Sequence, residues 1–255
     1  MFEHRLFQEL EVEVVATPKG RYYKIHDGSL LPSVTTVLGR MINKSGLVEW
    51  RKRVGYAEAD RITSVAGRRG SIIHDAVEKL VLNEPVPELV FAEQAMFQGV
   101  RPILEKNIGT VFGVEMPLYS KSLWAAGRTD LLAEWSGVPS VIDYKTTRFE
   151  KKEENILSYF LQSATYAFMA SSIYGISFHQ VVIVMIPIHE KPVIFVKDVK
   201  EYFEEVVDLF LKHRLTFEDH GSASWFRFGK KSPDLENTPA KSSSGATSPK
   251  DDFSR

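Results

Sequence analysis

The sequence predicts an α/β fold in which a central mixed sheet is flanked by helices on both faces. Residues 66–188 show a pattern of two helices, three strands, a further helix and a further strand, in that order. Residues 178–188 are a continuous apolar run, which is typical of a strand buried on both faces. A tight turn near Gly137 joins antiparallel strands, whereas a helical crossover joins parallel ones, so the sheet is expected to be mixed.

The composition is that of a globular protein. The chain has 255 residues, of which 44% are hydrophobic and 25% are charged, enough to bury a sizeable core. It contains no cysteine, which excludes disulfides, cysteine-based zinc sites and iron–sulfur clusters. We expect neither a signal peptide nor a transmembrane segment, because the N-terminus is rich in acids and no apolar stretch is long enough.

The N-terminal part is predicted to hold a hairpin and two helices. Residues 11–25 form two strand patterns around a turn at 18–20. Pro32 and Ser33 are suited to begin a helix. Residues 46–61 are predicted to be helical, with their charged side outward.

Residues 40–69 are strongly basic, with eight lysine or arginine residues and three acidic ones. Such a run is either the solvated face of a helix or a surface that follows the phosphates of a nucleic acid. Arg51, Arg68 and Arg69 are the candidates for the second interpretation. Trp50 and Tyr56 would then stack on bases, although packing in the core explains Trp50 at least as well.

Residues 66–82 are predicted to form a long helix with an apolar stripe along one side. His74 lies next to that stripe. Judged from this helix alone, it is more often a boundary histidine that is hydrogen-bonded to a neighbour than a metal ligand. A second helix is expected at 91–106, followed by a strand at 111–120 that carries Glu115.

Residues 124–148 predict a pair of antiparallel strands that brings acidic groups together. Asp130 alternates with apolar residues in the first strand, and Asp143 and Lys145 share one side of the second. Pairing makes Asp130 and Asp143 neighbours across the ladder. Two such carboxylates repel unless a cation joins them, and Mg²⁺ prefers carboxylate oxygens. With a lysine beside the ion, the pattern indicates metal-assisted hydrolysis of a phosphodiester.

The C-terminal part is predicted to continue with a helix at 153–174, the buried strand, an edge strand at 193–196 and a helix at 199–217. The last residues have almost no apolar side chains, so burial cannot repay the entropy of ordering them. The expected organisation is a hairpin extension at 1–30, one main domain at 31–228 and a disordered tail at 229–255.

The spacing of the charged residues resembles the core motif of the PD-(D/E)XK nuclease superfamily. The matching text is Gly127-x-x-Asp130 followed by Ile142-Asp143-Tyr144-Lys145. An aspartate at position 143, where many members have glutamate, is typical of the RecB-like branch. The likeness covers residues 31 to about 188 and implies a restriction-endonuclease-like αβββαβ core.

The resemblance implies a role for each matched residue. His74, Asp130 and Asp143 correspond to metal ligands. Glu115 corresponds to an acidic residue that serves a second metal ion or acts as a base, and Lys145 to the catalytic lysine.

A further pair, Gln162 and Tyr166, matches the Q-x-x-x-Y motif of RecB-type nucleases and would face the DNA strand. Ordinary helix packing explains this pair equally well, because tyrosine often spans core and surface.

The function implied by the resemblance is that of a DNA exonuclease that requires Mg²⁺ or Mn²⁺ and acts on single-stranded DNA or DNA ends. The chain is similar in this respect to phage exonucleases and to the mitochondrial genome maintenance exonuclease, and a cytoplasmic location in a bacterial or phage-infected host cell is expected. A structure-specific endonuclease and an inactive DNA-binding accessory protein are the alternatives. Helicase motifs are absent from the sequence, so the protein acts alone or with a helicase or a replication or recombination partner in trans.

Overall fold

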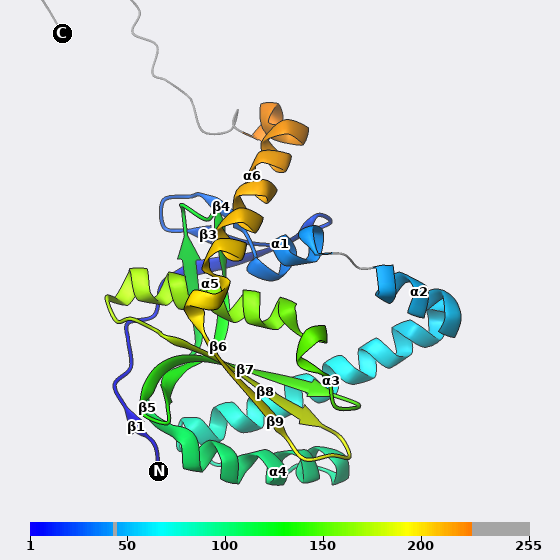
Figure 1. Ribbon diagram of the computed structural model, residues 1–255, viewed down its shortest axis with the longest axis vertical. Coiled ribbons are helices and arrows are strands. Elements are labelled where there is room, and N and C mark those ends of the chain that lie inside the picture. The colour runs from blue at the N-terminus through cyan, green and yellow to red at the C-terminus, as the bar shows by residue number, and fades with distance from the viewer. Residues whose placement is uncertain (43–44, 226–255) are drawn as a thin grey trace, which may run out of the picture.

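The computed structural model of the chain describes residues 1–42 and 45–225, and it confirms the mixed α/β fold (Figure 1). A six-stranded sheet in the order β1-β5-β6-β7-β8-β9 forms the centre. Its strands are β1 (Glu3–His4), β5 (Ile108–Ser120), β6 (Ala125–Trp135), β7 (Val138–Thr147), β8 (Gln180–Pro187) and β9 (Val193–Asp198).

The strand directions follow from the connections. The consecutive strands β5, β6 and β7 are antiparallel, and β7 and β8 are parallel because helix α5 crosses between them. The turn between β6 and β7 consists of Ser136 and Gly137, both at positive φ (51° and 83°). Two such residues in sequence match the twist of a hairpin, so the predicted tight turn is present. The order αβββαβ is therefore confirmed.

Two layers of helices cover the sheet. Helices α3 and α4 pack on one face, and α1, α5 and α6 on the other (Figure 1). Their bounds are α1 (Val34–Met41), α2 (Ser45–Val54), α3 (Tyr56–Val81), α4 (Phe91–Asn107), α5 (Leu157–Tyr174) and α6 (Phe203–Trp225), with short 3₁₀ helices η1 (Glu153–Asn155) and η2 (Val199–Tyr202).

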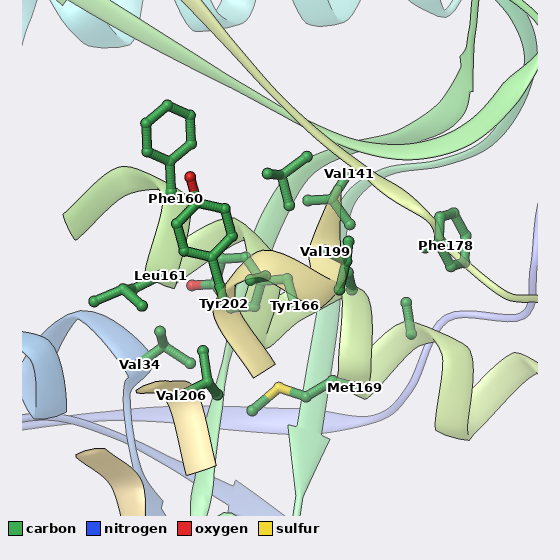
Figure 2. Close-up of a cluster of buried hydrophobic side chains, with 14 of the residues drawn as sticks. Val34, Val141, Phe160, Leu161, Tyr166, Met169, Phe178, Val199, Tyr202 and Val206 are labelled. Atoms are coloured by element: carbon green, nitrogen blue, oxygen red, sulfur yellow. The ribbon is translucent and has the colours of Figure 1, made fainter. Parts of the chain in front are cut away.

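Each face of the sheet has its own hydrophobic core. Val141 on β7 points to the α5 side, and its neighbour Ile142 points to the α3 side, as strand alternation requires. Figure 2 shows part of the α5-side core, where the Phe160 and Tyr202 rings stack with centroids 5.4 Å apart. Each fully buried side chain of this kind contributes about 1.5–3 kcal/mol. The two cores enclose the sheet, and Asp130 and Asp143 lie on its central strands, directly beyond the last pair of β6 and β7, Leu131 with Ile142.

The basic stretch differs from its prediction. The predicted helix at 46–61 is divided at Gly55, whose φ of 89° interrupts the helix, so α3 begins at Tyr56. Helix α2 buries none of its residues and extends from the body together with the start of α3 (Figure 1). Hydrophobic periodicity cannot locate helix ends where no side is buried. The predicted helix at 153–174 likewise begins as η1, and α5 starts at Leu157.

The predicted N-terminal hairpin is present as β2 (Val12–Thr17) and β3 (Gly20–Ile25), joined by β4 (Leu30–Pro32) into a second sheet. Strand β1 pairs with β5, so this part of the chain also contributes an edge to the central sheet. The tail predicted at 229–255 lies outside the described residues, and the domain bounds stay a prediction. No helix in the described part of the chain has the length and apolar character needed to cross a membrane.

Candidate active site

Three potential metal ligands converge from three elements. His74 lies on α3, Glu115 on β5 and Asp130 on β6, and one donor atom of each lies within 4.8 Å of the others. The strand register produces part of this arrangement, since Val114 pairs with Leu131 and the following pairs keep the same register, so Glu115 lies opposite Asp130. His74 reaches the sheet because α3 buries the adjacent Ile73 and Val77 against it. These three residues could hold a metal ion.

Hydrogen bonds with the backbone of Tyr144 fix two of the three ligands. The Tyr144 backbone N–H donates to Asp130 Oδ2 at 2.9 Å, and His74 Nε2 lies 2.9 Å from the Tyr144 carbonyl oxygen. A carbonyl can only accept, so Nε2 is the donor, and in the neutral ring Nδ1 then has a free lone pair. Nδ1 lies 3.6 Å from Asp130 Oδ2. Metal-binding histidines are commonly oriented in this way, with the other ring nitrogen bonded to a carbonyl.

The ionised carboxylate of Glu115 and its backbone conformation are both unfavourable in the folded protein. Burial, together with the negative charge of Asp130, raises the pKa of Glu115 to about 7. The residue also has a φ of 51°, in the left-handed region, which costs a residue with a side chain about 1–2 kcal/mol. Both features are typical of residues retained for function.

Asp143 and Lys145 form an ion pair on β7. Asp143 is 2% exposed, and Lys145 Nζ lies 2.5 Å from its Oδ2. Burial raises the pKa of Asp143, and the charge of Lys145 opposes that effect. Burial alone lowers the pKa of Lys145, but the charges of Asp143 and Asp130 raise it above the ordinary value. The lysine is therefore charged.

The donor set fits a divalent cation. Two carboxylates and an imidazole nitrogen with a free lone pair are ligands that such ions accept. Asp143 Oδ2 is buried, and its contact with Lys145 lacks hydrogen-bond geometry, so it has no hydrogen-bond donor among the described residues. Asp143 lies outside the cluster of three, however, and its role as a ligand stays a prediction.

The glycine of the G-x-x-D motif permits a close contact with α5. A Cβ atom on Gly127 would lie 2.5 Å from the Tyr166 hydroxyl oxygen. Tyr166 is 3% exposed and lies in the α5-side core (Figure 2), and burial raises its pKa well above the ordinary value. Its hydroxyl group interacts with the half-buried Gln162. The pair thus packs against β6, and its contact with DNA stays a prediction.

The three candidate arginines lie on two consecutive helices, Arg51 on α2 and Arg68 and Arg69 on α3. Arg51 forms an ion pair with Asp60 at 2.6 Å and lies over the Tyr56 ring. Arg69 is 3.5 Å from Glu93 on α4, whereas Arg68 is exposed. Contact between these arginines and DNA stays a prediction.

Some residues of the site were missed by sequence reasoning. Glu78 lines the same cleft as His74, Glu115 and Asp130. Its spacing of four residues from His74, one helical turn, is a signal that could have found it. Lys151 lies near Lys145 through a shared contact with Tyr159, and an irregular segment gives no periodic signal for such a contact.

No protein-family model and no curated protein sequence matches the chain. Among solved structures, it is similar to SSO0001, with 14% identity over 73% of this chain and 75% of that chain and a TM-score of 0.36. It is also similar to a protein of Eubacterium rectale described as a "putative exonuclease", with 13% identity over 69% and 77% of the two chains and a TM-score of 0.38. Similarities this low carry no argument about function.

Proposed function

We propose that this protein is a metal-dependent deoxyribonuclease that acts as an exonuclease on single-stranded DNA or on DNA ends. The observation that carries the proposal is the convergence of His74, Glu115 and Asp130 within 4.8 Å, beside the Asp143–Lys145 ion pair on the next strand. The sequence pattern that predicted these residues resembles that of a nuclease superfamily, and their chemistry fits phosphodiester hydrolysis.

The cation is proposed to be Mg²⁺ or Mn²⁺. When bound, it would activate water and neutralise charge on the phosphate. His74, Glu115 and Asp130 would hold it, and Asp143, whose Oδ2 contacts Lys145, would supply a further oxygen ligand. Because Tyr144 bonds both His74 and Asp130, these ligands are already oriented before a cation binds.

Lys145 is suited to act on the phosphate directly. Its ammonium group is held by Asp143 and stays charged, so it can donate to a non-bridging phosphate oxygen or orient the attacking water. Glu115 is suited to accept a proton, since a pKa of about 7 lies close to neutral pH. The exposed Arg68, on the helix that carries His74, adds positive charge for the DNA backbone.

The test is a cleavage assay with purified protein and Mg²⁺. The substrates are end-labelled single-stranded DNA, linear duplex and closed circular DNA. We expect progressive shortening of linear single strands or of DNA ends, with closed circles untouched. Asp130→Asn and Lys145→Ala should abolish cleavage. Glu134→Gln is the matched control, because Glu134 is on the same strand but bonds the Thr110 backbone at 3.0 Å.

Each other outcome identifies a different function. Nicked or linearised circles would replace the exonuclease with an endonuclease of the same fold. DNA binding without cleavage in Mg²⁺ or Mn²⁺ would indicate the accessory protein. Cleavage that survives Lys145→Ala would refute the mechanism.

A further inference from the structure

Tyr159, in the first turn of α5, has two lysine side chains against its ring. Lys145 Nζ lies 5.2 Å from the ring centroid, and Lys151 Nζ lies 5.1 Å from it. Lys151 also donates a hydrogen bond to the Tyr159 hydroxyl oxygen at 2.9 Å. Two ammonium groups, one of them that of the proposed catalytic lysine, therefore contact the same aromatic ring.

Lys151 has no negative partner. Within residues 1–42 and 45–225, its polar contact is the neutral Tyr159 hydroxyl, and no carboxylate pairs with it. The nearby Glu153 is instead paired with Lys197 at 2.5 Å. A half-buried ammonium group beside a second cation, without a counter-charge, is unfavourable unless an anion binds there.

The segment that carries Lys151 is fixed at the end of the sheet that bears Lys145. It follows β7 directly, and Thr147 Oγ1 donates to the Phe149 carbonyl at 2.7 Å. The Glu150 N–H donates to Glu190 Oε2, also at 2.7 Å. These bonds and the contact with Tyr159 give Lys151 a defined position rather than that of a free surface lysine.

We propose that Lys151 and Tyr159 form a second phosphate-binding subsite, which takes the backbone phosphate next to the scissile one. The inference rests on the proposed function, in which Lys145 acts on the scissile phosphate. Each Nζ atom lies about 5 Å from one ring centroid, so the two are at most about 10 Å apart, within reach of neighbouring phosphates of one strand. The Tyr159 hydroxyl accepts from Lys151 and still has its own proton to donate to a phosphate oxygen.

The test measures DNA binding separately from cleavage. A fluorescent single-stranded oligonucleotide is titrated with full-length protein in EDTA over a series of salt concentrations, and binding is followed by anisotropy. For Lys151→Ala we expect affinity about 10-fold weaker, the effect of one charge-assisted hydrogen bond, and a log–log salt slope smaller by about 0.7, the loss of one phosphate contact on a single strand. Tyr159→Phe should weaken binding and leave the salt slope unchanged.

The matched control is Lys152→Ala, which removes an adjacent but exposed lysine. It should change neither affinity nor slope. In Mg²⁺, Lys151→Ala should raise KM for DNA and leave kcat within about threefold, since it removes binding and not chemistry. Lys151→Gln, which keeps a polar side chain, serves if the alanine variant does not reach the wild-type unfolding temperature.

The outcomes separate this inference from the proposed function. The subsite is refuted if Lys151→Ala or Lys151→Gln binds with the affinity and salt slope of Lys152→Ala. It is also refuted if the substitution lowers kcat and leaves binding unchanged. A wild-type protein that binds DNA but does not cleave it overturns the proposed nuclease alone, because the binding titration still decides the subsite. A wild-type protein that does not bind DNA overturns both.

Discussion

Replacing Glu115 with glutamine should stabilise the metal-free protein at alkaline pH and impair its function. Glutamine has the shape of the glutamate but no charge, so the substitution removes the repulsion from Asp130 and the desolvation of a carboxylate. The same carboxylate is a proposed ligand of the cation. Stability and metal binding should therefore change in opposite directions.

The magnitude follows from the pKa. The pKa of Glu115 is about 7 in the folded protein against a reference value of 4.5, and each unit is worth about 1.36 kcal/mol. Because Glu115 is partly exposed, solvent screening reduces the resulting figure of roughly 3 kcal/mol to about 1–2 kcal/mol.

Whether the protein gains or loses stability as pH rises depends on which state, folded or unfolded, binds the Glu115 proton more tightly. A raised pKa means that the folded protein binds this proton more tightly than the unfolded chain does. The free energy of unfolding therefore falls as pH rises from about 4.5 to about 7. Glu115→Gln should raise the free energy of unfolding by about 1–2 kcal/mol at pH 8 and by less than about 0.5 kcal/mol at pH 5.

The assay is urea denaturation in EDTA, followed by fluorescence of the four tryptophans. The exposed Glu154, changed to glutamine, is the control and should show no gain at either pH. Adding Mg²⁺ should stabilise the wild type more than Glu115→Gln, because a ligand that binds only the folded state stabilises it. A Glu115→Gln protein that is no more stable than wild type at pH 8 in EDTA would refute this electrostatic account.

Three further substitutions test other parts of the site. Lys145→Met should lower cleavage at least about 100-fold. It should also destabilise the metal-free protein at pH 8 by about 2 kcal/mol, because Asp143 loses its counter-charge. An unchanged free energy of unfolding in urea would contradict the Asp143–Lys145 ion pair. Gly127→Ala should cost about 1–3 kcal/mol through contact with Tyr166, and Tyr166→Phe in the same chain should recover part of this loss; strictly additive changes in unfolding temperature would contradict the contact. His74→Ala should weaken Mg²⁺ binding at least about 10-fold, measured as the Mg²⁺ concentration for half-maximal thermal stabilisation; an unchanged value would exclude His74 as a ligand.

The fold was predictable where one side of each element is buried. Alternation in β6 and β7 specified which residues share a face, and the observed pairing of Leu131 with Ile142 agrees with the predicted proximity of Asp130 and Asp143. The strand order followed from the lengths and types of the connections. The helix boundary at Gly55 was missed, because α2 buries none of its residues and so gives no periodic signal.

Sequence reasoning named most residues of the candidate site, but it predicted few of the contacts between them. His74 was an ambiguous histidine from the helix pattern alone and became a candidate ligand only through its resemblance to a known motif. Its approach to Asp130 depends on how α3 packs on the sheet, which no local period encodes. Lys151 was missed for the same reason, because a tertiary contact with Tyr159 fixes its position.

Several charged groups of the candidate site oppose folding, and each would be stabilised by a ligand of opposite charge. Glu115 has a left-handed backbone and a raised pKa, Asp143 is a buried carboxylate, and Lys151 is an ammonium group without a counter-charge. A chain selected for stability alone would replace such residues, since apolar or neutral side chains of similar size cost less to bury. The proposed divalent cation would neutralise the carboxylates, and the proposed phosphate chain would neutralise the lysine. The two proposed ligands, a metal ion and a nucleic-acid backbone, would together offset these costs of folding.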